Sequence, residues 1–360
     1  NLQPIFLTSI TTAIGFLSMN FSDSPPFREL GTVAAFGVMS AFMLSMTIFP
    51  AMVLLLPLKP KRSEDKSAKW MRRFSERVVN QPNWLFWGLL IFAVVLISMM
   101  FRNELNDDTV KYFDENVPFR QAADFTQANL TGFHSIAYSL DSGESNGVIN
   151  PAFLTKVEAF REWYLAQPEV VYVSAFTDIM KRLNQNMHGD DTEWYALPDN
   201  RALAAQYLLL YEMSLPFGLD LNNLLNIDKS STLLTVRVKD QKSNQLIALD
   251  QRAQKWLAEN APNLVAPGAS VSIMFANIGK RNIDSMLVGS FFALVLVTTT
   301  LLIALRSWKY GLISLLPNAF PAGMAFGFWA IFVGEVNLAV AVIFAITLGI
   351  VVDDTVHFLT

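Results

Sequence analysis

Six long runs of uncharged, mostly apolar residues limit most strongly how this chain can fold. Hydrophobic residues make up 52% of the sequence and charged residues 16%, and the runs hold none of that charge. A helix of roughly 20 apolar residues crosses a bilayer, so we predict six transmembrane helices rather than core helices of a large soluble protein. The runs are Leu2–Ser22, Gly31–Leu58, Trp84–Phe101, Ser285–Leu305, Tyr310–Gly334 and Val336–Val352.

Several kinds of site are not expected in this chain. Cysteine is absent, so disulfides and thiolate metal sites are excluded. In the sequence, no acidic residue or histidine stands at metal-ligand spacing from His134 or His188, and no GxxxxGK[ST] loop for a nucleotide phosphate is found. We therefore predict no metal, no cofactor and no ATP-driven chemistry. The sequence opens at Asn1 inside an apolar run, without a signal peptide, so we expect a piece of a longer protein.

Basic residues between the second and third runs predict the orientation in the membrane. Residues 59–77 hold eight Lys and Arg against three Asp and Glu, and a second short loop carries Arg306 and Lys309. The positive-inside rule places both loops in the cytoplasm and residues 102–284 on the outer side. The predicted parts are a helix pair over 1–58, a basic linker over 59–83, a helix over 84–101, an external domain over 102–284 and three helices over 285–360.

The external segment reads as an α+β domain. Its residues alternate between strand-like and helix-like patterns in the order βαβ, then βαβ, which predicts a ferredoxin-like antiparallel sheet with both helices on one face. An α/β domain of another topology is the alternative. Residues 175–230, between the two units, are predicted to form an inserted helical lobe. The predicted strands are 133–140, 170–174, 231–239 and 270–276, and the predicted helices are 151–166, with Asn150 as its cap, and 244–260.

The last apolar run ends in LGIVVDDTVHFLT, which carries Asp353, Asp354 and His357. In a helix, residues three and four apart share a face, so His357 can approach both aspartates. Ionisable groups are costly in a membrane helix and usually mark an ion or proton path. We therefore predict a proton relay of these three residues. The alternative is that they form structural polar contacts or lie at the cytoplasmic headgroups.

Two further membrane segments carry polar or helix-breaking residues. Thr8, Thr11 and Thr12 form a stripe on the first helix, and small hydroxyl residues at this spacing usually join membrane helices through packing and hydrogen bonds. Pro317 and Pro321 are expected to kink the fifth helix. Gly323 and Gly327 form a GxxxG face, which predicts close approach of another helix.

The two ends of the chain resemble a known superfamily. The closing segment RSWKYGLISLLPNAFPAGMAFG, the GEVNLA turn and LGIVVDDTVHFL resemble the second half of bacterial resistance-nodulation-division (RND) exporters, in the MMPL/Patched-like branch. The opening LTSITTAIGFLSMNFSDSPPFRELGTVAAFGV resembles the last two helices of the first half. The resemblance implies helices five to ten of twelve, with residues 102–284 as the porter domain, in the bacterial inner membrane.

The resemblance implies a secondary transporter rather than an enzyme. We expect a proton-driven exporter of lipids or hydrophobic compounds, and the Asp353-Asp354-x-x-His357 form makes drug efflux less expected. Expected partners are protons, a hydrophobic or lipid substrate, membrane lipid, further copies of the chain and a periplasmic adaptor, with no nucleic acid. Alternative functions are a sterol-sensing-like lipid sensor or scaffold without pumping, and a proton-driven helper of protein secretion.

The resemblance also predicts one contact between the ends of the chain. In the superfamily, the fifth helix of one half approaches the acidic motif on the fourth helix of the other half, because the halves are related by a pseudo-twofold axis. Here these helices are 2–20 and 338–360. A buried carboxylate needs hydrogen-bond donors. We therefore expect at least one hydroxyl of the Thr8/Thr11/Thr12 stripe to reach Asp353 or Asp354.

Overall fold

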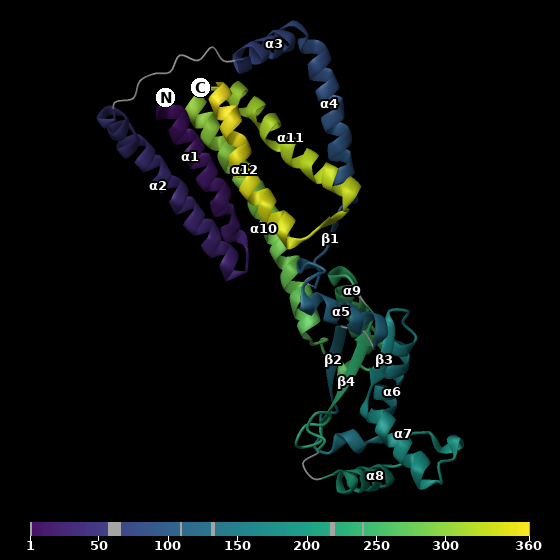
Figure 1. Cartoon of the computed structure of the whole chain (residues 1–360). Helices are drawn as coiled ribbons and strands as arrows, with labels where there is room; N and C mark the ends of the chain where they lie inside the picture. The colour runs from purple at the N-terminus through teal and green to yellow at the C-terminus, as the bar shows by residue number, and fades with distance from the viewer. Residues whose placement is uncertain are drawn as a thin grey trace. The chain divides into compact units, whose positions relative to one another are not determined.

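The computed structural model describes residues 2–56, 66–108, 110–130, 134–216, 220–239 and 241–359. Residues 59–65 of the predicted basic loop lie outside this part. The chain divides into two compact units: unit 1 comprises residues 1–106 and 279–360, and unit 2 comprises Asp107–Ile278. Figure 1 shows unit 1 as long helices and unit 2 as a small sheet with shorter helices.

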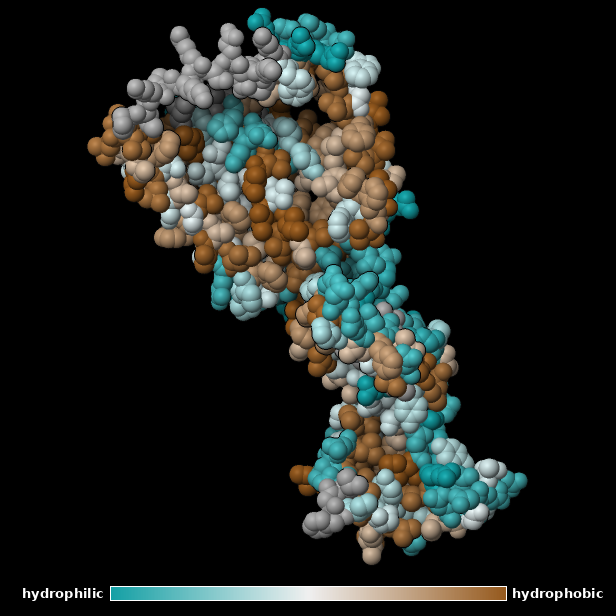
Figure 2. Space-filling view, in the orientation of Figure 1, coloured by the Kyte–Doolittle hydropathy of each residue, from teal (hydrophilic) through white to brown (hydrophobic). Residues whose placement is uncertain are grey.

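Unit 1 contains the long apolar helices. Among the described residues, six helices are long and apolar enough to cross a membrane, which confirms the prediction of six spans. Figure 2 shows hydrophobic residues spread over the outer surfaces of α2 and α4. The helices of unit 1 are α1 (Leu2–Leu17), α2 (Pro25–Leu55), α3 (Lys66–Asn80), α4 (Pro82–Met99), α10 (Val271–Leu305, which begins in unit 2), α11 (Trp308–Phe332) and α12 (Leu338–Leu359).

Short polar contacts fix which helix ends of unit 1 lie together. Strand β1 (Glu104–Leu105), just after α4, pairs in parallel with β5 (Glu335–Val336), just after α11. The ends of α4 and α11 are therefore at one side of the unit, and their starts are at the other. In the turn between α1 and α2, the Ser22 hydroxyl donates to Oδ1 of Asn282 on α10 at 2.8 Å. Because α3 precedes α4, and Arg306 and Lys309 lie at the start of α11, both basic segments lie on the side away from β1 and β5.

Helix α11 contains two prolines and packs closely on α4. Pro317 and Pro321 lie inside the helix. A Cβ atom on Gly327 would lie 1.8 Å from the carbonyl oxygen of Leu96, and one on Gly323 would lie 2.9 Å from the side chain of Ile97. Only glycine fits where two helix backbones approach this closely. The GxxxG face predicted from the sequence is therefore the contact surface between α11 and α4.

Unit 2 is built around a three-stranded antiparallel sheet. Its strand order is β2 (His134–Asp141), β4 (Ser231–Val238), β3 (Val170–Ser174), so β2 and β3 are parallel with β4 between them. This is a split βαβ arrangement. The remaining helices are α5 (Pro118–Asn129), α6 (Pro151–Leu165), α7 (Phe176–Met187), α8 (Arg201–Ser214) and α9 (Ser243–Asn260).

Helices α6 and α9 cover one face of this sheet. The rings of Phe160 on α6 and Trp256 on α9 stack with centroids 5.4 Å apart, and Phe160 also packs edge-on against Tyr138 of β2. Ile136, Tyr138 and Leu140 alternate along β2 and are all fully buried, as expected for a strand with one covered face. The one-sided arrangement predicted for the two helices is therefore present.

The predicted strand over 270–276 is wrong. Ala269 pairs briefly with Ala137 of β2, but the next residues begin α10. The Ser270 hydroxyl accepts a hydrogen bond from the backbone N–H of Ile273 at 3.1 Å, which caps the helix. The buried residues Ile273, Ala276, Ile283 and Met286 follow a helical period. The strand-like composition of VSIMFA gave the wrong prediction because the apolar period extends beyond it, and the described sheet lacks the fourth strand of a ferredoxin-like fold.

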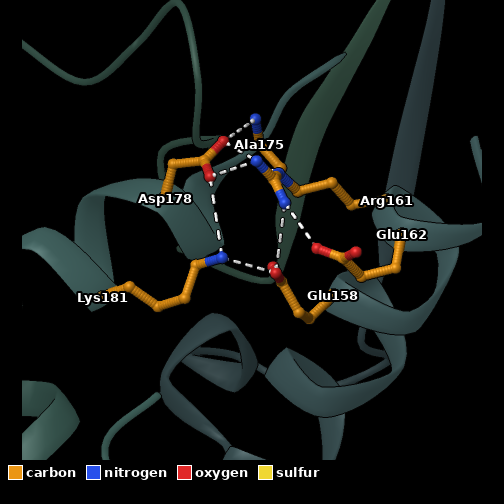
Figure 3. Close-up of polar contacts among 6 residues, drawn as sticks. All are labelled: Glu158, Arg161, Glu162, Ala175, Asp178 and Lys181. Carbon is orange, nitrogen blue, oxygen red and sulfur yellow. Dashed lines mark hydrogen bonds and ion pairs between the residues drawn. The ribbon is translucent and has the colours of Figure 1, made fainter. Parts of the chain in front are cut away.

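An ionic cluster joins α6 to α7 in unit 2 (Figure 3). Lys181 lies 2.5 Å from the Glu158 carboxylate, and the Arg161 guanidinium contacts Glu158 at 3.3 Å and Asp178 at 2.9 Å. Asp178 also accepts from the backbone N–H of Ala175 at the start of α7. Because the cations and carboxylates alternate, each charge has a neighbour of opposite charge. Since the cluster links α6 to α7, it attaches the predicted helical lobe to the sheet domain.

Candidate functional site

Helices α1 and α12 cross in close contact next to the acidic motif. A Cβ atom on Gly15 of α1 would lie 2.6 Å from the Cα atom of Gly349 on α12. Toward the start of α1 and the end of α12, Leu7 packs against Val352 and Val356 and against two residues of α10. The absence of side chains at the crossing brings the two backbones together, and the predicted pairing of these helices is present.

Asp353 lies one turn after Gly349 and points toward α1. The Thr12 hydroxyl is 3.3 Å from Oδ1 of Asp353 and 3.2 Å from the carbonyl oxygen of Gly349. Asp353 is partly buried, and the preceding residue on its helix, Val352, is fully buried. A hydroxyl has one proton to donate and lone pairs to accept, so Thr12 can serve either of these oxygens and can also accept from a protonated carboxyl group.

The other two threonines of the stripe do not reach the acidic motif. The Thr8 hydroxyl donates to the carbonyl oxygen of Ile5 at 3.0 Å, and the Thr11 hydroxyl donates to that of Leu7 at 2.9 Å. Threonine commonly bonds the carbonyl one turn earlier when no better acceptor is near. Of the three hydroxyls predicted to support the acidic motif, the structure therefore brings only Thr12 to an aspartate.

Asp354 and His357 lie on the exposed part of α12. In the part of the chain that the structure describes, neither forms a hydrogen bond or an ion pair. Neighbouring helix residues point about 100° apart, so Asp354 turns away from α1 when Asp353 faces it. Among the described residues, Asp353 is therefore the predicted relay residue with a hydrogen-bond partner, the Thr12 hydroxyl, and the relay itself stays a prediction.

A buried pair of polar residues near the motif was not predicted. The Thr355 hydroxyl on α12 donates to Oδ1 of Asn318 on α11 at 2.7 Å, and Asn318 is fully buried. Among the described residues, Nδ2 of Asn318 has no hydrogen-bond partner. A buried amide without a partner is costly. The sequence did contain a sign of this pair, because Asn318 is a strongly polar residue between two prolines inside an apolar run.

Asn318 lines an apolar pocket between α11 and α12. The pocket has a volume of about 240 Å³ and is otherwise lined almost wholly by carbon. Its walls include Phe326 and Trp329 on α11 and Phe344 and Leu348 on α12. A pocket with mostly apolar walls and one placed polar group suits a hydrophobic molecule with a single hydrogen-bonding group.

Comparison with known proteins supports the resemblance seen in the sequence. The family described as the MMPL family matches residues 3–85, which cover α1, α2, α3 and the start of α4. No curated protein sequence matches the chain. Among solved structures, the hedgehog release protein Disp from the water bear Hypsibius dujardini is similar with a TM-score of 0.61 and 14% identity, over 99% of this chain and 48% of Disp.

These comparisons confirm the predicted resemblance to the MMPL/Patched-like branch. The family match covers the opening helices, and the likeness to Disp extends the shared fold over nearly the whole chain. Because the two sequences are only 14% identical, the likeness to Disp shows a shared fold and not a shared function. The chain spans about half the length of Disp. It is therefore a multi-pass membrane protein whose fold is similar to that of Disp. A shared fold does not by itself define the cargo or the energy source.

Proposed function

We propose that this chain is part of a secondary transporter of the RND type that uses a proton gradient to export lipids or other hydrophobic compounds. The observation that carries the proposal is the partly buried Asp353 carboxylate at the α1–α12 crossing, with the Thr12 hydroxyl 3.3 Å away. A carboxylate in a membrane helix is costly unless it is paired or functional. The proposed setting is the bacterial inner membrane, with unit 2 as an external porter-like domain.

The contact gives Asp353 two distinct hydrogen-bonded states. When the carboxylate is charged, the single proton of the Thr12 hydroxyl is best donated to Oδ1 of Asp353. When Asp353 binds a proton, its O–H becomes a donor, and the Thr12 hydroxyl turns to the Gly349 carbonyl 3.2 Å away. Protonation also removes a charge between apolar helices. In this proposal it changes the packing of α1 against α12, and Asp354 and His357 deliver protons from the exposed part of α12.

The basic residues of unit 1 support the proposed orientation. Helix α3 precedes α4, and Arg306 and Lys309 lie at the start of α11. The ends of α4 and α11 meet at β1 and β5, so both basic segments lie at the same side of the unit. The positive-inside rule makes that side cytoplasmic. The Asp353 end of α12 lies toward that side as well, because α12 starts from the β5 end.

The test is proton-coupled export by the protein in vesicles with an imposed pH gradient. Asp353→Asn keeps the size and hydrogen bonding of the side chain but cannot titrate, and we expect transport to fall to the level of vesicles without the protein. Thr12→Val should reduce transport less, because the carboxylate remains. Thr8→Val is the matched control, since the Thr8 hydroxyl bonds only its own helix. Full proton-coupled export by Asp353→Asn would disprove the proposal.

A lipid sensor without transport is the second candidate function, and the α11–α12 pocket favours it. Its walls are apolar, and Nδ2 of Asn318, which has no partner in the described part of the chain, can donate to one acceptor on a ligand. The two functions differ in one measurement. A sensor binds hydrophobic ligand equally well in wild type and Asp353→Asn and moves none under a pH gradient, whereas a transporter moves it.

A further inference from the structure

Helix α3, Lys66–Asn80, has one apolar and one basic face. Trp70, Phe74 and Val78 recur every four residues and so form a stripe, with Met71 beside it. These side chains are exposed, Trp70 by 64% and Phe74 by 57%. Trp70 and Phe74 stack along the stripe with ring centroids 5.8 Å apart. Within the described residues, no other element covers this stripe.

The opposite face of α3 is charged and mainly positive. Arg72 and Arg73 lie there with the single acid Glu76, which pairs with Arg72 at 3.1 Å in an exposed position. Arg77, three residues after Phe74, lies at the edge of the apolar stripe. Across the whole helix, the sequence holds five Lys and Arg and one acid. Figure 2 shows hydrophilic residues gathered over α3, in contrast to the hydrophobic surfaces of α2 and α4. An excess of positive charge on such a face fits a negatively charged surface.

The position of α3 along the chain fixes it close to the membrane surface. Only Gln81 separates its last residue, Asn80, from the first residue of α4, Pro82. Helix α4 is one of the apolar spans. A single connecting residue reaches at most about 3.6 Å, so the end of α3 cannot leave the level at which α4 enters the bilayer. An exposed apolar stripe at that level faces the boundary between headgroups and acyl chains.

We infer that α3 is a membrane-surface helix that binds anionic phospholipid. Trp70, Phe74 and Val78 insert below the headgroups, and Arg72, Arg73 and Arg77 contact phosphates at the water side. This binding anchors the cytoplasmic end of α4. The inference does not depend on transport by unit 1, because it rests on the faces of α3 and its link to α4.

The natural absence of cysteine gives a direct test of insertion. Phe74→Cys and Glu76→Cys place a nitroxide label on the apolar and the charged face of the otherwise intact protein, reconstituted in nanodiscs. With phosphatidylglycerol present, we expect the label at 74 to collide more with oxygen than with a water-soluble nickel chelate, and the label at 76 to show the reverse. Equal access of the nickel chelate to both labels, or shielding of position 74 from both reagents, would overturn the inference.

Lipid charge is tested by comparing phosphatidylglycerol with pure phosphatidylcholine discs. The oxygen-to-nickel ratio at position 74 should fall several-fold in the neutral lipid. A variant with Arg72, Arg73 and Arg77 all changed to Gln should remove this dependence on lipid charge. Lys255→Gln is the matched control, since that exposed lysine lies in unit 2. An unchanged dependence in the triple variant, with equal yield of folded protein, would show that the arginines do not bind the lipid.

Discussion

The two units use the same apolar residue types in opposite ways. Unit 2 has a core of large side chains, in which Tyr138, Phe160, Tyr164 and Phe176 are all fully buried. Unit 1 leaves many large side chains exposed, and its closest helix contacts are made by glycines such as Gly15 and Gly349. Burial from water drives the first arrangement. In lipid that driving force is absent, so close backbone packing joins the helices instead.

Polar groups differ between the units in the same way. Unit 2 links them into networks, in which Asp250 accepts from Tyr138 and Gly268 and the ionic cluster joins α6 to α7. Burial, with Tyr164 and Asp250 nearby, raises the pKa of Tyr138 well above its usual value, so its hydroxyl stays a donor. Unit 1 holds isolated pairs such as Thr12 with Asp353. A group in a network is held by several hydrogen-bond partners. In an isolated pair, the gain or loss of one proton changes the hydrogen bond that joins the two residues.

The largest expected effect comes from filling the glycine crossing of unit 1. Gly15→Leu would force side-chain atoms into the backbone of Gly349, 2.6 Å from the new Cβ. We expect a loss of stability of about 3 kcal/mol or more, because a backbone cannot move aside as a side chain can. Thermal unfolding of the protein in detergent measures it. Gly37→Leu is the control, since nothing lies within 4 Å of a Cβ at Gly37, and equal behaviour of the two variants would contradict the crossing.

The next effect concerns the buried network of unit 2. Asp250→Ala leaves the Tyr138 hydroxyl and the Gly268 N–H without the oxygen that they now share, at 2.6 and 2.9 Å. We expect unfolding free energy to fall by about 2 kcal/mol. Tyr138→Phe should cost less, because Asp250 keeps its bonds from Gly268 and Gln254. Urea unfolding gives both values, and a larger loss in Tyr138→Phe would mean that the carboxylate does not organise the network.

A smaller effect is expected from the ionic cluster between α6 and α7. Lys181→Met removes one of the two cations that contact Glu158 and leaves Arg161 as the other. The expected loss is about 1–2 kcal/mol, because the carboxylates remain partly buried with less compensation. Lys255→Met is the control, with a side chain that is 78% exposed. If both variants unfold at the same urea concentration, the cluster does not fasten the helical lobe.

The smallest expected effect is the acid sensitivity of unit 2. Burial by itself would raise the pKa of Glu158, but the hydrogen bond and charge of Lys181, with Arg161, hold it below its usual 4.5. The folded carboxylate therefore stays charged at a lower pH than the unfolded one. Its stabilisation is complete above about pH 4.5 and is lost as pH falls through the folded pKa. Glu158→Gln should flatten this decline in urea unfolding measured from pH 6 downward, and an equally steep decline would exclude Glu158 as its source.

Long periodic patterns were predictable from the sequence, and contacts between distant residues mostly were not. The apolar runs specified the six spans, and the helix predicted over 244–260 is found as Ser243–Asn260. The start of α10 was predicted wrongly because a short β-branched stretch resembles a strand when the period on both sides is ignored. The bond between Asn318 and Thr355 depends on how α11 meets α12, which no local pattern encodes. Thr12 could be anticipated because a resemblance supplied the pairing of helices.

The prolines of α11 have a mechanical consequence for the pocket beside them. Proline has no N–H, so the helix lacks the hydrogen bonds from Pro317 to the Ile313 carbonyl and from Pro321 to the Pro317 carbonyl. The bending stiffness of α11 is therefore lowest around Asn318, while the segments before and after it keep their full bonding. A small energy is enough to tilt one half of α11 against the other. Asn318 lies in this flexible segment, lines the pocket and accepts a hydrogen bond from Thr355 of α12. A bend of α11 at Asn318 therefore changes the width of the pocket and the position of α12 together.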